Sequence, residues 1–290
     1  MKTIAVVSGK GGTGKTTFTA GLASLIKKPF TLVDCDVDAA NLSLLFDITT
    51  KQEIDFCGSD IAEINYKLCA GCGACGENCR FDAVSYNRDS DRFLVNRIAC
   101  EGCGVCTIVC PADAVSLIRI KTGEIKISET DTFKIVHADL LPGCGASGLL
   151  VKEVKKEAEK ISAESELILI DGPPGIGCPF IATVSGVDYA IIVAEPGLSS
   201  LHDLKRAKDV IEIFGAKIFV VINRFDISAE ITKKIEEYCS SNNIPVAGKI
   251  PYDTTVFESV KNLMPITKYN CPASEALKEC FSYIAENTGI

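Results

Sequence analysis

A glycine-rich segment near the N-terminus restricts the fold more than any other feature of this 290-residue chain. Residues 9–16 read G-K-G-G-T-G-K-T and match the pattern G-x-x-x-x-G-K-[ST]. An apolar run, Ile4–Ser8, precedes the segment, and a helical pattern over residues 15–27 follows it. A loop of this kind binds phosphate with its own amides and with the N-terminus of the helix after it. The segment therefore predicts a strand–loop–helix unit that binds a nucleotide.

Apolar runs without alternation recur along the rest of the chain and indicate strands buried on both faces. These runs lie at 30–34, 167–170, 189–194, 218–222 and 246–250. Helical patterns lie between them at 149–161, 201–214 and 230–242. Strands alternating with helices predict an α/β fold, a doubly wound and mostly parallel sheet.

Composition and charge narrow the class of protein. Hydrophobic residues make up 47% of the chain and charged residues 23%, which is typical of a globular protein with a core. The formal net charge of -8 argues against a nucleic-acid partner, because phosphate backbones require a basic surface. The chain has no apolar window long enough for a membrane span and no secretory signal pattern at its start. We therefore expect a cytoplasmic protein with no nucleic-acid and no membrane partner.

Eight of the 15 cysteines fall within the 42 residues from Cys69 to Cys110. The spacing C-x2-C-x2-C-x3-C occurs twice there, and the two copies are 31 residues apart, so an internal duplication is the simplest interpretation. Thiolates at this spacing bind [4Fe–4S] clusters. Two zinc sites are the alternative, although structural zinc favours pairs of C-x2-C separated by a longer segment.

The cysteine-rich segment differs from its flanks in composition and pattern, because it is rich in glycine and has no long helical pattern. We therefore predict an inserted α+β ferredoxin-like domain at 60–122, between two parts of the nucleotide-binding domain at 1–59 and 123–290. The bacterial two-cluster pattern predicts crossed ligand sets. One cluster takes Cys69, Cys72, Cys75 and Cys110, and the other takes Cys100, Cys103, Cys106 and Cys79. Pro111 follows the second motif as in that pattern, whereas Arg80 replaces the first proline.

The additional Lys10 makes the loop resemble the deviant Walker A loop of the superfamily of MinD, ParA, the Mrp-type carriers and the nitrogenase iron protein. The resemblance implies an ATP-hydrolysing homodimer that uses Mg²⁺, with Lys10 reaching the partner's nucleotide; a solvated loop lysine is the alternative. Lys15 reaches the β- and γ-phosphates, and the Thr16 hydroxyl ligates Mg²⁺. The residues expected to hold the nucleotide are Gly11, Gly12, Thr13, Gly14, Lys15, Thr16 and Thr17.

Other landmarks of this superfamily follow in order. By the resemblance Asp36 orients or deprotonates the attacking water, with Asp34 and Asp38 as competing candidates. Asp171, in D-G-P-P-G after an apolar run, holds Mg²⁺ through water. The positions that resemble adenine contacts are Asn223, Arg224, Pro251 and Asp253.

Two further cysteines resemble those of the nitrogenase iron protein. Cys178 lies seven residues after Asp171, and Cys144 lies in the small-residue segment P-G-C-G-A-S-G. In the iron protein such cysteines of two subunits share one [4Fe–4S] cluster, so the resemblance implies a bridging cluster here. The alternative is that Cys178 packs as a small apolar side chain.

Taken together, the chain resembles MinD-superfamily ATPases with an inserted ferredoxin domain. We expect an ATP-dependent electron donor that holds two [4Fe–4S] clusters per monomer and delivers electrons to a partner metalloenzyme. One alternative is an iron–sulfur carrier that transfers a cluster to an apo-acceptor. Another is a MinD-type positioning ATPase, which needs a membrane-binding helix; residues 274–287 are more acidic than basic and fit that role poorly.

Overall fold

The computed structural model describes residues 1–290 and divides into two compact units. The first, which we name the sheet unit, comprises residues 1–54, 125–139 and 147–290. The second, which we name the cysteine unit, comprises residues 55–124 and 140–146. The cysteine unit thus contains the predicted insertion, residues 60–122, together with a short segment from farther along the chain.

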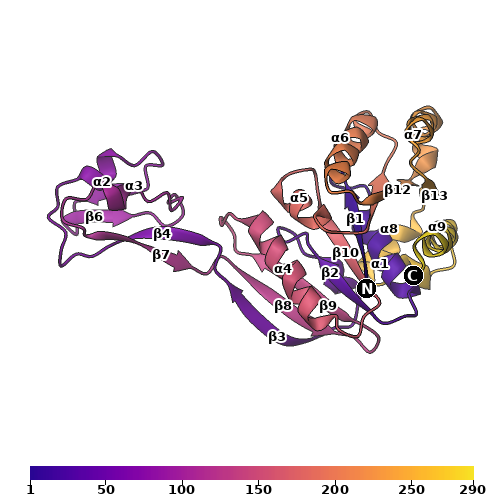
Figure 1. Ribbon diagram of the computed structural model, residues 1–290, viewed down its shortest axis with the longest axis horizontal. Coiled ribbons are helices and arrows are strands. Elements are labelled where there is room, and N and C mark those ends of the chain that lie inside the picture. Colours follow the sequence, from indigo (N-terminus) through magenta and orange to yellow (C-terminus); the bar gives the residue numbers. More distant parts are fainter. The chain divides into compact units, whose positions relative to one another are not determined.

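The sheet unit is built on one sheet of nine strands (Figure 1). Their order across the sheet is β13-β12-β11-β1-β10-β2-β9-β8-β3, and the seven strands from β13 to β9 are parallel. The bounds are β1 Lys2–Ser8, β2 Phe30–Asp34, β3 Thr49–Phe56, β8 Gly123–Glu129, β9 Lys134–Leu140, β10 Leu167–Pro174, β11 Tyr189–Ala194, β12 Lys217–Asn223 and β13 Val246–Ile250. The α/β fold with a mostly parallel sheet is therefore confirmed.

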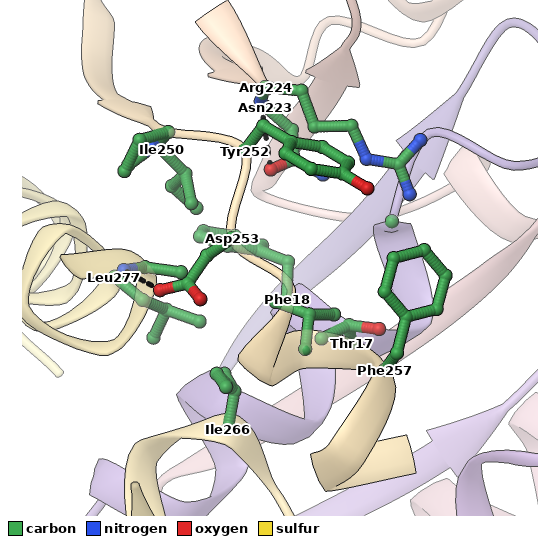
Figure 2. A pocket seen from close by; sticks show the side chains of 14 residues that line it. Thr17, Phe18, Asn223, Arg224, Ile250, Tyr252, Asp253, Phe257, Ile266 and Leu277 are labelled. Carbon is green, nitrogen blue, oxygen red and sulfur yellow. Dashed lines mark hydrogen bonds between the residues drawn. The ribbon is translucent and has the colours of Figure 1, made fainter. Parts of the chain in front are cut away.

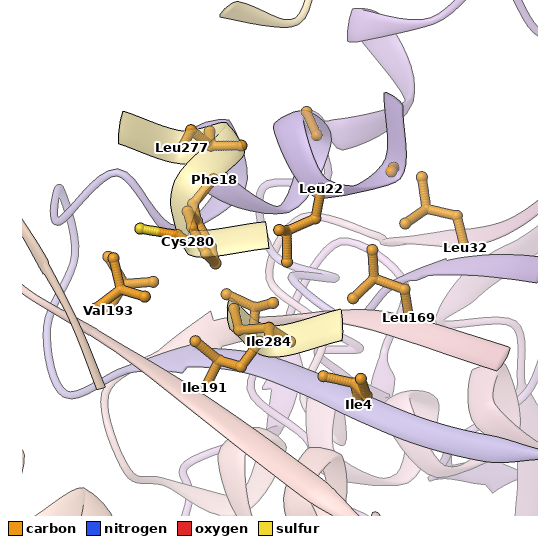
Figure 3. Packing of buried hydrophobic residues seen from close by; sticks show 14 of the residues in the cluster. Ile4, Phe18, Leu22, Leu32, Leu169, Ile191, Val193, Leu277, Cys280 and Ile284 are labelled. Atoms are coloured by element: carbon orange, nitrogen blue, oxygen red, sulfur yellow. The ribbon is translucent and has the colours of Figure 1, made fainter. Parts of the chain in front are cut away.

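Helices cover both faces of this sheet. Ile4 of β1 packs in one cluster with residues of α1 and α9, as Figure 3 shows, and Val6 belongs to the same cluster. Ala5 and Val7 are equally buried on the opposite face. The helices are α1 Lys15–Leu25, α4 Ser147–Ile161, α5 Cys178–Val184, α6 Ser200–Ile213, α7 Ala229–Ser241, α8 Thr255–Lys261 and α9 Pro272–Thr288. None of the helices has the length and continuous apolar character needed to span a bilayer.

The predicted strands and helices all form, with small differences at their ends. Helix α1 ends at Leu25 instead of Lys27, because Ile26 is already extended and Pro29 follows shortly after. Strands β3, β8 and β9 were not predicted. Strand β3 has no continuous apolar run, and it lies almost fully exposed at the edge of the sheet.

The cysteine unit repeats one small pattern twice. Strand β4 (Ser59–Ile64) pairs with β7 (Val115–Ile120), and β5 (Val84–Asn87) pairs with β6 (Arg92–Val95), both antiparallel. Short helices α2 (Ala74–Glu77) and α3 (Val105–Ile108) carry cysteines of the two motifs. The 31-residue repeat maps Ile64 onto Val95 and Val84 onto Val115. Because Ile64 pairs with Val115 and Val84 with Val95, each half of the repeat pairs its strands with the other half.

Candidate functional site

The carboxylate of Asp171, in β10, contacts three polar side chains of helix α1. Lys15 Nζ lies 3.1 Å from Asp171 Oδ1, and Thr16 Oγ1 donates to Asp171 Oδ2 at 2.7 Å. Thr19, one turn farther along α1, donates to Oδ1 at 2.7 Å. Asp171, Lys15 and Thr19 are all buried. The two predicted phosphate and Mg²⁺ residues of the loop therefore meet the predicted Mg²⁺ aspartate, and Thr19 is a member of this group that the motif did not include.

Three aspartates lie at the end of β2 and just after it, and they differ in burial. Asp34 is fully buried and accepts the amides of Asp36 at 3.0 Å and Leu42 at 3.1 Å. Burial, helped by the nearby Asp171 carboxylate, raises the pKa of Asp34 to about 7. Asp36 is half-buried, and burial raises its pKa as well, whereas Asp38 is exposed. Asp34 thus anchors the loop that presents Asp36, which favours Asp36 among the three candidates.

A partly open pocket lies beside the glycine-rich loop (Figure 2). Its lining includes the predicted nucleotide residues Gly14, Thr17, Asn223, Arg224, Pro251 and Asp253. Apolar side chains such as Ile250, Phe257 and Leu277 complete the wall. The Asp253 carboxylate accepts the amides of Thr255 and Ala273, so it holds the starts of α8 and α9. An apolar cavity with a few convergent polar groups fits a planar base.

Side chains from the end of β12 hold the glycine-rich loop itself. Asn223 Nδ2 donates to the Thr13 carbonyl at 2.7 Å, and Arg224 Nη1 donates to the Gly12 carbonyl at 3.3 Å. Gly14 has a φ of 86°, and a side chain there would collide with Asn223. The glycine pattern of the loop therefore allows both its left-handed backbone and the close approach of β12.

Lys10 lies against its own chain. It is half-buried and lines a cavity of about 220 Å³ with Glu195 and Asp203, and its Nζ lies 2.9 Å from the position that a Cβ on Gly197 would take. Its predicted reach into a partner's nucleotide stays a prediction, since the structure is that of a single chain.

Four cysteines of the two motifs share one cavity in the cysteine unit. The cavity of about 340 Å³ is lined by Cys79 of the first motif and by Cys100, Cys103 and Cys106 of the second. Burial raises the pKa of the Cys75 thiol, and the nearby Cys69 and Cys110 thiolates add to the rise. The cavity therefore combines three cysteines of the second motif with the last cysteine of the first, and Cys75 lies near both Cys69 and Cys110.

Backbone amides point at three of these sulfurs. Ala83 N donates to Cys79 Sγ and Ala114 N to Cys110 Sγ, both at 3.3 Å, and Ala62 N donates to Cys100 Sγ at 3.4 Å. Six of the eight cysteines also pack against the small apolar core of the unit. No three His, Cys, Asp or Glu side chains gather closely enough to hold a single metal ion.

The remaining cysteines differ in accessibility. Cys178 is exposed at the first residue of α5, where Gly148 of α4 packs directly on it. Cys144 is half-buried in the cysteine unit, with its amide donating to the Leu141 carbonyl at 3.0 Å. Cys57 is exposed, whereas Cys35, Cys239, Cys271 and Cys280 are buried, and burial raises the pKa of Cys35 to about 12. A cluster held by Cys144 and Cys178 stays a prediction.

Comparison with known proteins places this site in a family. The chain matches the model of the CobQ/CobB/MinD/ParA nucleotide binding domain over residues 4–266. It is 37% identical over 289 residues to the Methanocaldococcus jannaschii protein MJ0578, which covers 98% of this chain and 96% of that protein.

Solved structures show the same fold. The cell division ATPase MinD of Pyrococcus furiosus covers 99% of each chain with a TM-score of 0.59 and 21% identity. MinD of Pyrococcus horikoshii, solved with Mg-ADP, covers 99% of this chain and 97% of its own with a TM-score of 0.60 and 21% identity. The chain belongs to the CobQ/CobB/MinD/ParA nucleotide-binding family and is a MinD/ParA-type P-loop ATPase.

Proposed function

We propose that this ATPase uses its nucleotide cycle to control electron delivery from two [4Fe–4S] clusters in the cysteine unit to a partner metalloenzyme. The observation that carries the proposal is the cavity lined by Cys79, Cys100, Cys103 and Cys106. Four thiols drawn from both motifs form the ligand set that the doubled spacing predicts for one cluster.

The strand exchange within the cysteine unit supports the second ligand set. Asn65 N donates to the Ala114 carbonyl and Asn96 N donates to the Ala83 carbonyl, both at 2.7 Å. These two bonds are related by the 31-residue repeat, so Cys79 and Cys110 are each carried across to the opposite half. By this internal symmetry Cys110 joins Cys69, Cys72 and Cys75.

The sequence spacing favours clusters over zinc. Structural zinc prefers pairs of C-x2-C separated by a longer segment, whereas this chain has C-x2-C-x2-C-x3-C twice. The amides aimed at Cys79, Cys100 and Cys110, and the apolar core behind the thiols, are features that stabilise iron–sulfur clusters.

In the sheet unit the residues divide the work of ATP hydrolysis. Lys15 and the loop amides bind the phosphates, while Thr16 and Asp171 hold Mg²⁺, which when bound neutralises phosphate charge. Asp36, presented by the buried Asp34, orients the attacking water. Lys10 completes the site of a second copy in a cytoplasmic homodimer.

In the cysteine unit the thiols of the two motifs would hold each cluster. A bound cluster would supply one-electron chemistry at low potential. The core formed by Ala62, Ile64, Val84 and Val115 packs against six of the eight cysteines and would shield that side of the clusters from water.

Anaerobic purification, iron analysis and electron paramagnetic resonance test the proposal. We expect about eight irons per monomer and two cluster signals after reduction. About ten irons per monomer would support the further cluster at Cys144 and Cys178. One iron or zinc per four cysteines, or no bound metal after reconstitution, would contradict the proposal.

Single cysteine variants test the crossed ligand sets. Cys79→Ala should perturb the signal of the cluster held by the second motif, and Cys110→Ala that of the cluster held by the first. Cys57→Ala, an exposed cysteine outside both sets, is the matched control and should leave both signals unchanged.

A cluster carrier is the second candidate, and the exposure of Cys178 favours it, because a transferable cluster needs accessible thiols. A carrier would transfer its cluster to an apo-acceptor, and this transfer should stop when Cys178 is replaced by alanine. The electron donor keeps its iron through repeated reduction and oxidation.

A further inference from the structure

One ion pair spans the glycine-rich loop and joins the ends of two neighbouring strands. Arg224 directly follows β12, and Glu195 directly follows β11. Arg224 Nη1 donates both to Glu195 Oε1 at 3.2 Å and to the Gly12 carbonyl at 3.3 Å. The side chains are 29% and 20% exposed, so the pair is largely shielded from solvent. Figure 2 shows the Arg224 side chain extending away from the apolar end of the cavity.

The backbone at this place is held in an unusual conformation. Arg224 has a φ of 53°, in the left-handed region that residues other than glycine rarely adopt. Strain of this kind persists where the surroundings fix the residue, and it is enriched at functional sites. The preceding Asn223 uses its side chain for the next loop carbonyl, that of Thr13. Two adjacent residues therefore hold two adjacent carbonyls of the loop.

Holding these carbonyls also orients the phosphate-binding amides. A peptide group is planar and trans, so its C=O and N–H point in opposite directions. A carbonyl of Gly12 drawn toward Arg224 turns the amide of Thr13 to the other side, and the bond from Asn223 does the same for Gly14. Amides aimed together in this way form the anion-binding concavity of a P-loop.

We propose that Arg224 and Glu195 form a latch that sets the affinity of the loop for the triphosphate and is indifferent to the base. Both are positioning residues, because they act through the Gly12 carbonyl. Glu195 keeps the flexible guanidinium in place, and its own carbonyl is fixed by the amide of Gly197 at 2.8 Å. This role is an alternative to the adenine contact that the sequence predicted for Arg224, and it rests on the ATPase site alone, independently of iron–sulfur clusters.

Nucleotide binding and steady-state hydrolysis test the latch in the full chain. Dissociation constants are measured for ATP, GTP and adenosine with wild type, Arg224→Gln, Arg224→Lys and Glu195→Ala. A lost hydrogen bond to a charged group corresponds to a factor of about ten in an equilibrium constant. We expect Arg224→Gln and Glu195→Ala to weaken ATP and GTP about tenfold each, with adenosine unchanged. KM for ATP should rise while kcat stays within about twofold.

The conservative variant and a matched control separate the latch from a structural role. Arg224→Lys keeps one cationic donor and should recover part of the affinity. Glu129→Gln removes an ion pair with Lys51 of 2.7 Å on β3 and β8, away from the loop, and should change no dissociation constant. If the variants lost affinity for ATP but not for GTP, Arg224 would be an adenine contact and the latch would be overturned. Unchanged affinities in Glu195→Ala would also overturn it, and absence of hydrolysis by the wild type would instead refute the ATPase assignment.

Discussion

At the scale of single residues, the site depends on how one carboxylate is shared. Asp171 accepts from Thr16 and Thr19 and pairs with Lys15, so its two oxygens are fixed from three directions before any nucleotide binds. Lys15 and Thr16 have predicted roles of their own on the phosphates and Mg²⁺. Thr19 has only the carboxylate and the Lys15 carbonyl, at 3.0 Å, as partners. We therefore predict that Thr19 orients Asp171.

Removing the Thr19 hydroxyl should lower the rate of ATP hydrolysis while the protein still folds. We expect Thr19→Val to lower kcat about tenfold, because a hydrogen bond to a charged group contributes about 1.5–3 kcal/mol. Steady-state ATP hydrolysis and thermal unfolding measure the two effects. Thr288→Val, which removes a hydroxyl bonded only to the Ile284 carbonyl of its own helix, is the control and should leave kcat unchanged. Equal rates for Thr19→Val and wild type would refute this role.

His137 should make stability depend on pH in the weakly acid range. The ring is buried between Ser128 and the charged Lys126 and Asp139. Burial lowers the pKa of His137 below its usual 6.5, Lys126 lowers it further, and Asp139 opposes the shift. Between the two pKa values the unfolded chain binds more protons than the folded one, so stability rises with pH. The contribution is complete above pH 6.5 and is lost as pH falls through the depressed pKa.

The free energy of unfolding of His137→Gln, measured in urea across this pH range, should therefore rise less steeply with pH than that of wild type. His202→Gln is the matched control, since the His202 side chain is 70% exposed. If stability depended on pH as steeply in His137→Gln as in wild type, the predicted role of His137 would be wrong.

The sequence located candidate chemical residues but could not show how the structure arranges them. Lys15, Thr16, Asp36 and Asp171 stand in a motif or after an apolar run, so their positions could be predicted from pattern alone. Which aspartate after β2 is buried depends on the amides of a loop eight residues farther on, which no local pattern contains. Thr19 and Glu195 carry no motif, although the spacing of Thr19 from Lys15 places both on one helix face.

At the scale of elements, helix α9 lies directly on strand β13. Gly248 of β13 faces Cys280 of α9, and a side chain at Gly248 would collide with the Cys280 sulfur. Cys280 belongs to the cluster drawn in Figure 3 and is 1% exposed. This contact keeps α9, and with it Ala273 and Leu277, against the nucleotide cavity.

Adding a methyl group at this contact should destabilise the fold. We expect Gly248→Ala to lower the free energy of unfolding by about 1–3 kcal/mol, since inserted methyl groups strain a packed core. The double variant Gly248→Ala/Cys280→Ala should recover part of this loss, because the second change removes the colliding sulfur. A double-mutant cycle in urea measures the coupling, and additive effects of the two changes would contradict the predicted contact.

Elements were predictable where burial is continuous. The central parallel strands contain continuous apolar runs, such as Ile4–Val7 in β1, so pattern alone located them and the helices between them. Strand β3 reads T-T-K-Q-E-I-D-F and is held by its neighbour β8, not by its own composition. Helix α5 has only seven residues, too few for a helical period to emerge from the sequence.

At the scale of the whole molecule, MinD/ParA family proteins commonly form dimers, and Lys10 is the residue whose role depends on a second copy. In the single chain it lies in a small cavity beside Gly197. We expect a non-hydrolysable ATP analogue with Mg²⁺ to convert the monomer into a dimer in wild type. Lys10→Ala should bind the analogue but stay monomeric and lose hydrolysis, because a partner's lysine is then missing from each site.

Light scattering after size exclusion, together with nucleotide affinity, checks this prediction. The neighbouring charge variant Lys205→Ala, on the exposed side of α6, is the control and should dimerise as wild type does. Dimerisation of Lys10→Ala to the wild-type extent would show that the lysine has no role across an interface.

The pairing of β4 with β7 brings the two ends of the inserted segment, residues 59–120, together. Ser59 stands opposite Ile120, and the Thr122 amide donates to the Phe56 carbonyl at 2.8 Å, so this segment begins and ends side by side. A two-residue Asn-Gly turn can close such a pair of antiparallel strands. We therefore expect that the segment with all eight motif cysteines can be excised here, transplanted into another host or exchanged for a different insertion, while residues 140–146 of the cysteine unit stay with the rest of the chain.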